Sequence, residues 1–252
     1  MFGKLFKSNI FKAAKRGDID EVASFLANGV AVNSKNEYGW PLLCSAVSKG
    51  HFGLVAYLIS EGADVNLATD MGVTPLSAIE VDNPLAAALL VVHGANVNPP
   101  PSKYGMTPLW DATYRGLPLV ANYLIAHGAH IDAKDDMTGN TPLTLAAWKG
   151  LTDTVIYLLA KGANPNGQNN KRQTPLRYAV FHRDILMIEA LITFGADPHI
   201  DAIDIAELQK DYAIANMLRE QIGEQEKDYR KQKMWDMVEK IAGVAAQVAS
   251  QL

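Results

Sequence analysis

The residue types that most often bind metals or carry catalysis do not converge in this sequence. No two of its six histidines have the spacing at which one helix presents a pair of zinc ligands. The six are His51, His93, His127, His130, His182 and His199. Cys44 is the single cysteine, which excludes an intramolecular disulfide and fits a reducing compartment. The sequence therefore predicts no metal site.

The acidic and glycine-containing segments also lack the residues that a calcium site or a phosphate-binding loop requires. Asp132, Asp135 and Asp136 lie together, but the glycine and the terminal glutamate of a calcium loop are missing. The glycines recur singly at regular intervals and do not form a phosphate-binding loop. Catalysis requires polar groups that converge in a pocket. We therefore expect a protein that has no cofactor and is not an enzyme.

The regular intervals indicate a repeated unit that must position every exposed side chain. Residues 141–166 read TPLTLAAWKGLTDTVIYLLAKGANPN, a pattern that predicts two short helices joined by a turn. Equivalent units follow at steps of 33, 33, 33, 34, 33 and 27 residues, starting near Ser8, Pro41, Thr74, Thr107, Thr141, Thr174 and Asp201. A period close to 33 residues is typical of a stacked solenoid, so we expect one elongated, mainly α-helical domain.

Each unit carries its own start and stop signals. A Thr-Pro pair places threonine at the N-cap and proline at the first helical position, where its missing N–H costs nothing. A closing glycine ends the second helix in the left-handed conformation. Leu58, Leu124 and Leu158 belong to a column with the spacing of a core-facing stripe. Repeat three is one residue short and has Asn83-Pro84 between its helices, so we expect its second helix in a shifted register.

The sequence motifs of these units resemble those of the ankyrin-repeat family. The GA-x-x-N ending closes units at 62–66, 94–98 and 162–166, and the phrase Thr-Pro-Leu opens repeats at Thr74, Thr107, Thr141 and Thr174. The resemblance covers roughly residues 8–222. It implies an ankyrin-repeat solenoid of about seven helix-turn-helix repeats. It also implies that the connecting excursions form β-hairpin loops, which line a concave face together with the first helices.

The segments that flank the repeats complete the predicted organisation. Residues 1–7 form an N-terminal cap, because a terminal repeat has one open side. Residues 223–252 break the period and predict a C-terminal amphipathic helix with the seam Met234, Val238, Ile241, Ala245, Val248 and Leu252. This helix either folds back on the solenoid, pairs with a second copy or contacts a partner. We favour a monomer.

Composition narrows the class of partner. The net charge of −4 argues against general nucleic-acid binding, which requires a basic surplus. The longest wholly apolar run, residues 85–92, is too short to span a bilayer. The N-terminus is basic but lacks the apolar run of a secretory signal. We expect a cytoplasmic location, with an amphipathic transit peptide as the alternative.

If the residues that recur in each repeat build the stack, the positions that vary between repeats select the partner. These are the loop tips and the two residues after the Ala-Ala column of each first helix. The first of the two becomes aromatic in repeats four to six, and the second is basic in most repeats. Rigid aromatics beside Arg or Lys are typical of interface hot spots. The predicted partner-binding residues are Tyr38, Trp40, Lys49, Tyr104, Met106, Trp110, Tyr114, Arg115, Met137, Trp148, Lys149, Phe181 and His182.

These residues predict a non-catalytic protein-binding module that grips a partner protein with its concave face. Lys49, Arg115 and Lys149 predict an acidic patch on the partner, so its association would slow as salt rises. Within this class the protein is an adaptor, or a dedicated inhibitor such as an immunity protein that blocks an enzyme or toxin. The alternative is a host-directed or membrane-associated adaptor that uses the C-terminal helix as a second contact.

Overall fold

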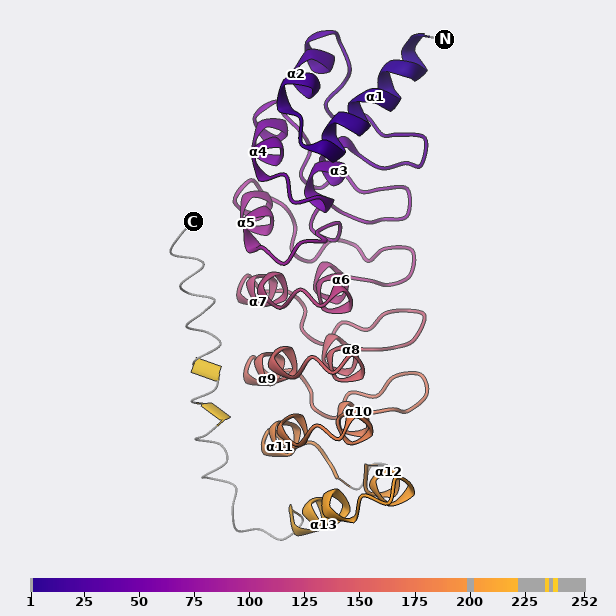
Figure 1. Cartoon of the computed structure of the whole chain (residues 1–252), viewed down its shortest axis with the longest axis vertical. Coiled ribbons are helices and arrows are strands. Elements are labelled where there is room, and N and C mark those ends of the chain that lie inside the picture. The colour runs from indigo at the N-terminus through magenta and orange to yellow at the C-terminus, as the bar shows by residue number, and fades with distance from the viewer. Residues whose placement is uncertain (1, 199–201, 222–233, 236–237, 240–252) are drawn as a thin grey trace. The chain divides into compact units, whose positions relative to one another are not determined.

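The computed structural model describes residues 2–198, 202–221, 234–235 and 238–239. In these residues the chain forms 13 α-helices and no regular β-strand, which confirms the predicted mainly α-helical repeat fold (Figure 1). The chain divides into two compact units, Met1–Ala129 and His130–Leu252, named unit 1 and unit 2. The boundaries predicted for the two flanking segments stay predictions.

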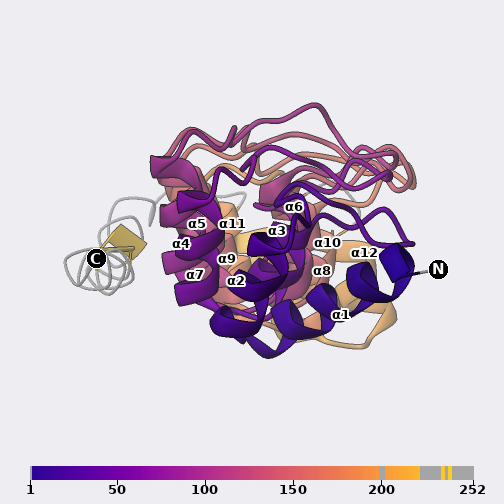
Figure 2. The same cartoon turned by 90° about the horizontal axis from the view of Figure 1, so that it is seen from above.

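Unit 1 contains a layer of first helices and a layer of second helices (Figures 1 and 2). The first helices are α1 (Phe2–Arg16), α3 (Leu42–Ser48) and α6 (Pro108–Arg115). The second helices are α2 (Ile19–Ala27), α4 (Phe52–Ser60), α5 (Pro84–Val92) and α7 (Pro118–Ala126). Helix α1 packs on α3, and α5 packs on both α4 and α7. Residues 2–16 form one helix, so the predicted cap continues into the first repeat without a break.

Unit 2 has the same two layers. Its first helices are α8 (Pro142–Trp148), α10 (Pro175–His182) and α12 (Ala202–Leu208). Its second helices are α9 (Thr152–Ala160), α11 (Ile185–Thr193) and α13 (Tyr212–Gln221). Helix α10 packs on both α8 and α12, and α9 packs on α11. The predicted apolar column is fully buried at Leu58, Leu90, Leu124, Leu158 and Leu191, and its first member, Phe25, is half-buried.

Helix starts follow the predicted capping chemistry. The Thr107, Thr141 and Thr174 hydroxyls each accept a hydrogen bond from the backbone N–H three residues on, at 3.1 to 3.2 Å. Proline follows each of them at the first helical position. Pro41 stands at the N-cap of α3 and provides no side-chain hydrogen bond, as its sequence predicts. These caps fix the residues at which α6, α8 and α10 begin.

Repeat three has lost its first helix, which corrects the expectation of two helices in every repeat. Residues 75–78 form a single turn, and the next helix in the chain is α5. Asn83 is extended (φ −135°, ψ 120°) and its side chain accepts from the Leu85 N–H at 2.9 Å. Proline disfavours helical geometry in the residue before it, so Pro84 keeps Asn83 extended. With one residue fewer, the repeat has no room for a complete first helix.

The loops between repeats, called fingers, are tighter than the β-hairpins that the resemblance implied. Their β-pairing among the described residues is limited to one isolated bridge, between Lys35 and Pro41. In each finger one polar residue donates its backbone N–H to a carbonyl four or five residues on, at 2.8 to 3.2 Å. Its side chain also accepts backbone N–H groups that a strand ladder would pair. These residues are Asn36, Thr69, Ser102, Asp135 and Asn169.

The asparagine that ends most repeats ties one repeat to the next. Asn66 donates its amide N–H to the Gly94 carbonyl at 2.9 Å and accepts from the Asn96 N–H at 2.8 Å. The same pair of bonds recurs in unit 2. Asp132 occupies this position once, where it accepts from the Asn164 N–H at 3.0 Å. A carboxylate has no N–H, so the donating half of the clamp is missing there.

The predicted C-terminal helix lies mostly outside the described residues. Within it, Met234 and Val238 are buried, and the Trp235 ring meets the edge of Phe194 with centroids 6.3 Å apart. The seam positions from Ile241 onward, and the choice between fold-back, dimer and partner contact, fall on residues outside this part. In the described part of the chain, no helix is long and apolar enough to cross a membrane.

Candidate partner-binding surfaces

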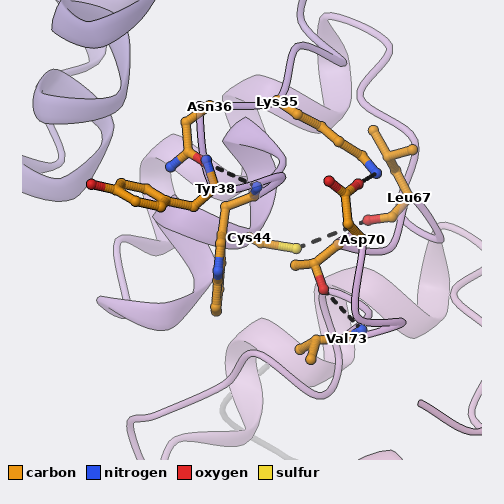
Figure 3. A network of polar contacts seen from close by, with 9 residues as sticks. Lys35, Asn36, Tyr38, Cys44, Leu67, Asp70 and Val73 are labelled. Carbon is orange, nitrogen blue, oxygen red and sulfur yellow. Dashed lines mark hydrogen bonds and ion pairs between the residues drawn. The ribbon is translucent and has the colours of Figure 1, made fainter. Parts of the chain in front are cut away.

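The first finger of unit 1 presents Tyr38 at its tip. Asn36 lies beside it (Figure 3), and its side-chain oxygen accepts from the backbone N–H groups of Tyr38 at 2.9 Å and Trp40 at 3.0 Å. Lys35 binds Asp70 of the next finger, with Nζ 2.9 Å from Oδ1. Tyr38 is 76% exposed, whereas Trp40 is half-buried. The finger is thus a braced turn that carries one exposed aromatic ring.

The third finger is braced in the same way. The Ser102 hydroxyl accepts from the Met106 N–H at 3.2 Å, and the Lys103 N–H donates to the Met71 carbonyl of the preceding finger at 3.0 Å. Tyr104 is 39% exposed and Met106 is half-buried. Neither side chain is as exposed as Tyr38.

On α6, the two predicted aromatic residues have different environments. Trp110 is buried, with 6% of its surface exposed, while Tyr114 is 47% exposed. Their rings stack with centroids 5.1 Å apart and planes 10° apart. The Trp110 indole N–H has no hydrogen-bond acceptor among the described residues. Trp110 is therefore a support beneath Tyr114 rather than a surface residue.

The basic side chains of unit 1 meet an acidic residue of their own unit. Glu80 lies in the shortened repeat three, 3.2 Å from Lys49 Nζ and 3.6 Å from an Arg115 guanidinium nitrogen. Sequence reasoning missed this bridge because the three residues belong to three different repeats. Arg115 also lies close to Asp111, whose carboxyl accepts from Ser77. Burial outweighs both and raises the pKa of Asp111 to about 6.

In unit 2 the equivalent positions are mainly apolar and exposed. Trp148 is 47% exposed and Phe181 is 62% exposed. Lys149 Nζ lies 5.7 Å from the centre of the Trp148 ring, the geometry of a cation–π contact. His182 has a structural contact, because its Nε2 lies 2.8 Å from the Trp148 carbonyl oxygen. Met137, at a finger tip, is 61% exposed.

The residues with the most reactive side chains have structural roles. Burial raises the pKa of Cys44 to about 12, so its thiol stays protonated, 3.9 Å from the Leu67 carbonyl oxygen (Figure 3). Asp82 accepts from the Leu119 and Val120 N–H groups at 2.9 and 3.2 Å and so caps α7 from another repeat. Burial raises the pKa of Asp82 as well, and these two hydrogen bonds oppose that rise.

Two family descriptions match this sequence. The description "Ankyrin repeats (3 copies)" matches residues 10–98 and 131–202, and "Ankyrin repeat" matches residues 104–136. Together these matches cover more than half of the chain. The chain belongs to the ankyrin-repeat family.

Similar proteins support this assignment. The ankyrin repeat-containing protein P1E11.10 of Schizosaccharomyces pombe is 38% identical over 72 residues, which are 29% of this chain and 35% of that protein. The human ASB11 ankyrin repeat domain superposes with a TM-score of 0.72 at 24% identity, covering 86% of this chain and 99% of the domain. An ankyrin repeat domain from Acinetobacter baumannii AYE gives 0.65 at 25% identity, covering 76% and 100%.

Ankyrin repeats are a protein–protein interaction module, and their fold is typically a non-catalytic binding module. Two exposed residues of this ankyrin repeat protein escaped sequence analysis. Leu208 follows Phe181 in the first-helix column and is 82% exposed, and Tyr212 is 62% exposed. Glycine usually marks the turn after this column, but repeat seven has Lys210 there with φ +57°. Extending the column to repeat seven would have identified Leu208.

Proposed function

We propose that this ankyrin repeat protein is a non-catalytic module that binds a partner protein through the free positions of its first helices and finger tips. The observation that carries the proposal is the exposure of large side chains at equivalent positions, 47% for Tyr114, 47% for Trp148 and 62% for Phe181. Water-facing positions seldom hold rows of aromatic residues unless a partner covers them. Tyr38, Tyr104 and Met137 add exposed side chains from the fingers.

The roles of the polar side chains support a non-catalytic function. Asp82 and Asp184 cap helices, and His51 and His182 bind backbone carbonyl oxygens of the preceding repeat. A catalytic acid, base or nucleophile needs a free position facing a substrate. These groups are committed to holding repeats together instead.

Two uses of such a module remain within the proposal. An adaptor joins two proteins, whereas a dedicated inhibitor, including an immunity protein, blocks one enzyme or toxin. Both uses fit a cytoplasmic protein with one buried cysteine. An acidic patch on the partner remains part of the proposal, as Lys49, Arg115 and Lys149 predict it, and in unit 1 Lys49 and Arg115 also meet Glu80.

The test is to isolate the partner by affinity capture, purify the complex and titrate it by calorimetry against three single variants. Trp148→Ala should weaken binding by about 2 kcal/mol or more, as truncation of a central aromatic anchor does. Tyr114→Ala should cost about 1 kcal/mol, because Trp110 remains beneath it. Val92→Ala is the matched control, since Val92 is 78% exposed on a second helix. Equal affinities for all three variants would refute the proposed surface.

The same complex separates adaptor from inhibitor. If the captured protein is an enzyme, its activity should fall in proportion to added ankyrin protein and reach zero at equal molar amounts. Retained activity in a fully formed complex would assign the adaptor role.

A further inference from the structure

In unit 2 the second-helix layer is covered on its outer face, the side that points away from the first helices. A tyrosine recurs five residues before the closing glycine in three repeats, at Tyr57, Tyr123 and Tyr157. It is half-buried in α4 and α7, but only 5% of Tyr157 on α9 is exposed. With 3.6 residues per turn, Tyr157 lies on the side of α9 opposite Val155 and Leu159, which belong to the buried column. The first helices therefore do not account for the burial of Tyr157.

The end of α11 carries an apolar side chain where the other repeats are polar. Phe194 precedes the closing glycine of repeat six and is half-buried. The residues at this position in repeats one to five are polar or charged, and all are exposed: Asn28, Glu61, His93, His127 and Lys161. The stack of repeats does not require an apolar residue here. Phe194 therefore indicates a contact specific to repeat six.

The C-terminal segment supplies that contact. The Trp235 and Phe194 rings meet edge to face, with centroids 6.3 Å apart and planes 61° apart. Met234 and Val238 are only 5% and 7% exposed, whereas Trp235 is 46% exposed and Glu239 is exposed. Met234 and Val238 are four positions apart, the spacing of side chains on one face of a helix. One face of this segment is thus covered, next to the end of α11.

The two covered places on the second helices belong to one layer. Helices α9 and α11 pack on each other. Tyr157 and Phe194 both lie outside the buried column of their helices, five positions and one position before the closing glycine. An apolar helical turn that contacts Phe194 can therefore extend toward the outer side of α9.

We propose that the outer face of α9 and α11 is a docking site for an apolar helical turn, and that the C-terminal segment of the same chain occupies it through Met234, Trp235 and Val238. Apolar anchors one turn apart are typical of a helix that binds a packed helical surface. The site lies on second helices, so it is separate from the surface of first helices and fingers proposed to bind a partner. A partner helix would have to displace this segment to use the face.

The test is the binding of a fluorescently labelled synthetic peptide of residues 223–252 to the full chain, measured by anisotropy. The release variant combines Met234→Asp and Val238→Asp, because buried carboxylates should drive its own segment off the face. The peptide should bind this variant roughly tenfold or more tightly than the native chain, in which the attached segment competes at high effective concentration. Glu239→Ala changes an exposed residue of the same segment and should behave as the native chain does.

Two further changes locate the contact on both sides. A peptide that carries Met234→Asp and Val238→Asp should not bind the release variant. Phe194→Lys, added to the release variant, gives repeat six the residue type that repeat five has at Lys161, and it should weaken the native peptide by roughly tenfold or more. Circular dichroism checks the folding of each chain. If the release variant is unfolded, hydrogen exchange of residues 234–239 is compared between the native chain and Phe194→Lys, and it should be faster in the variant.

Equal affinity of the peptide for the native chain and a folded release variant would overturn the inference, and so would a release variant that does not bind the peptide. Binding that is unchanged by Phe194→Lys, or exchange that is unchanged by it, would do the same. A native dimer that the release variant fails to form, measured by sedimentation, would make a second copy the occupant and also overturn the inference. None of these results bears on the proposed function, whose test uses variants of the first helices.

Discussion

Units 1 and 2 contain the same repeat, but the side chains at its variable positions differ in type and exposure. In unit 1, Lys49 and Arg115 both meet Glu80, and the largest aromatic ring of α6, Trp110, is buried. In unit 2, the equivalent column exposes Trp148, Phe181 and Leu208, and its lysine lies over an aromatic ring. The backbone of the repeat is compatible with both arrangements of side chains. What differs is how many large apolar side chains this column exposes, so the binding energy should concentrate in unit 2.

The turns show a second difference between the units. All the non-glycine residues with positive φ in the described part of the chain lie in unit 2: Arg172, Arg183 and Lys210. In unit 1 the finger turns that correspond to Arg172 have Gly39, Gly72 and Gly105, and the inter-helix turns that correspond to Arg183 and Lys210 have Gly17, Gly50 and Gly116. Left-handed geometry is costly for a residue with a Cβ atom. Unit 2 thus accepts local strain at turns that border its exposed surface.

The largest predicted effect on stability tests the buried charge of unit 1. Folding raises the pKa of Asp111 from 3.8 to about 6, so the folded state binds a proton between these values and its stability falls as pH rises through that window. Asp111→Asn cannot ionise. It should be more stable than the native chain by about 3 kcal/mol at pH 7.5, since each pKa unit corresponds to about 1.4 kcal/mol.

Urea unfolding of both proteins at pH 4, 5 and 7.5 measures this difference directly. The two should be equally stable near pH 4 and diverge above it. A variant that is less stable than the native chain at pH 7.5 would mean that the contacts of Asp111 with Arg115 and Ser77 outweigh its burial.

The next effect concerns the asparagine clamp, present at Asn66 in unit 1 and incomplete at Asp132 in unit 2. Asn66→Asp should destabilise the chain by about 1 kcal/mol, because the bond to the Gly94 carbonyl is lost. Asp132→Asn should stabilise it by a similar or smaller amount by supplying the missing donor. Thermal unfolding of the two variants checks the opposite signs, and shifts in the same direction would contradict the clamp.

The sequence predicted the fold well because its signals are local. Threonine caps, closing glycines and the leucine column each depend on a few adjacent residues, and the structure places them as expected. Sequence analysis missed the loss of the first helix in repeat three, where the residues are apolar as in the other first helices. The helix is lost because one residue is deleted and Pro84 follows. A comparison of equivalent positions between repeats does not detect this combination.

The candidate surface was harder to predict because burial depends on neighbouring repeats. Trp110 and Tyr114 lie four residues apart on one helix, yet one is buried and the other exposed. The pairing of Lys49 with Glu80 joins residues 31 positions apart. Leu208 was missed because the exposed column was read only from repeats one to six. Sequence analysis included Trp110 among the partner-binding residues, but the structure buries it, and the predicted column ended at repeat six.

A smaller effect tests whether Glu80 neutralises the basic residues of unit 1. Glu80→Gln leaves Lys49 and Arg115 without their shared carboxylate, so association with an acidic partner should become faster by about threefold at low salt. Stopped-flow rates with the captured partner at increasing ionic strength measure this. Glu61→Gln makes the same charge change on the second-helix layer and should have less effect. Equal rates for the native chain and Glu80→Gln would mean that unit 1 takes no part in electrostatic steering.

The smallest effect addresses the strained turns of unit 2. Arg172 has φ +58°, where the finger turns of unit 1 have glycine, and Arg172→Gly should relieve its left-handed strain. Glycine also loses more conformational entropy on folding, so the net gain should be only about 0.5 kcal/mol. Lys171→Gly, one residue earlier and without positive φ, is the matched control and should lose stability by a similar amount. Chemical unfolding of the two variants gives the sign at each position, and a loss at both would show that strain at this turn is negligible, leaving exposure as the difference between the units.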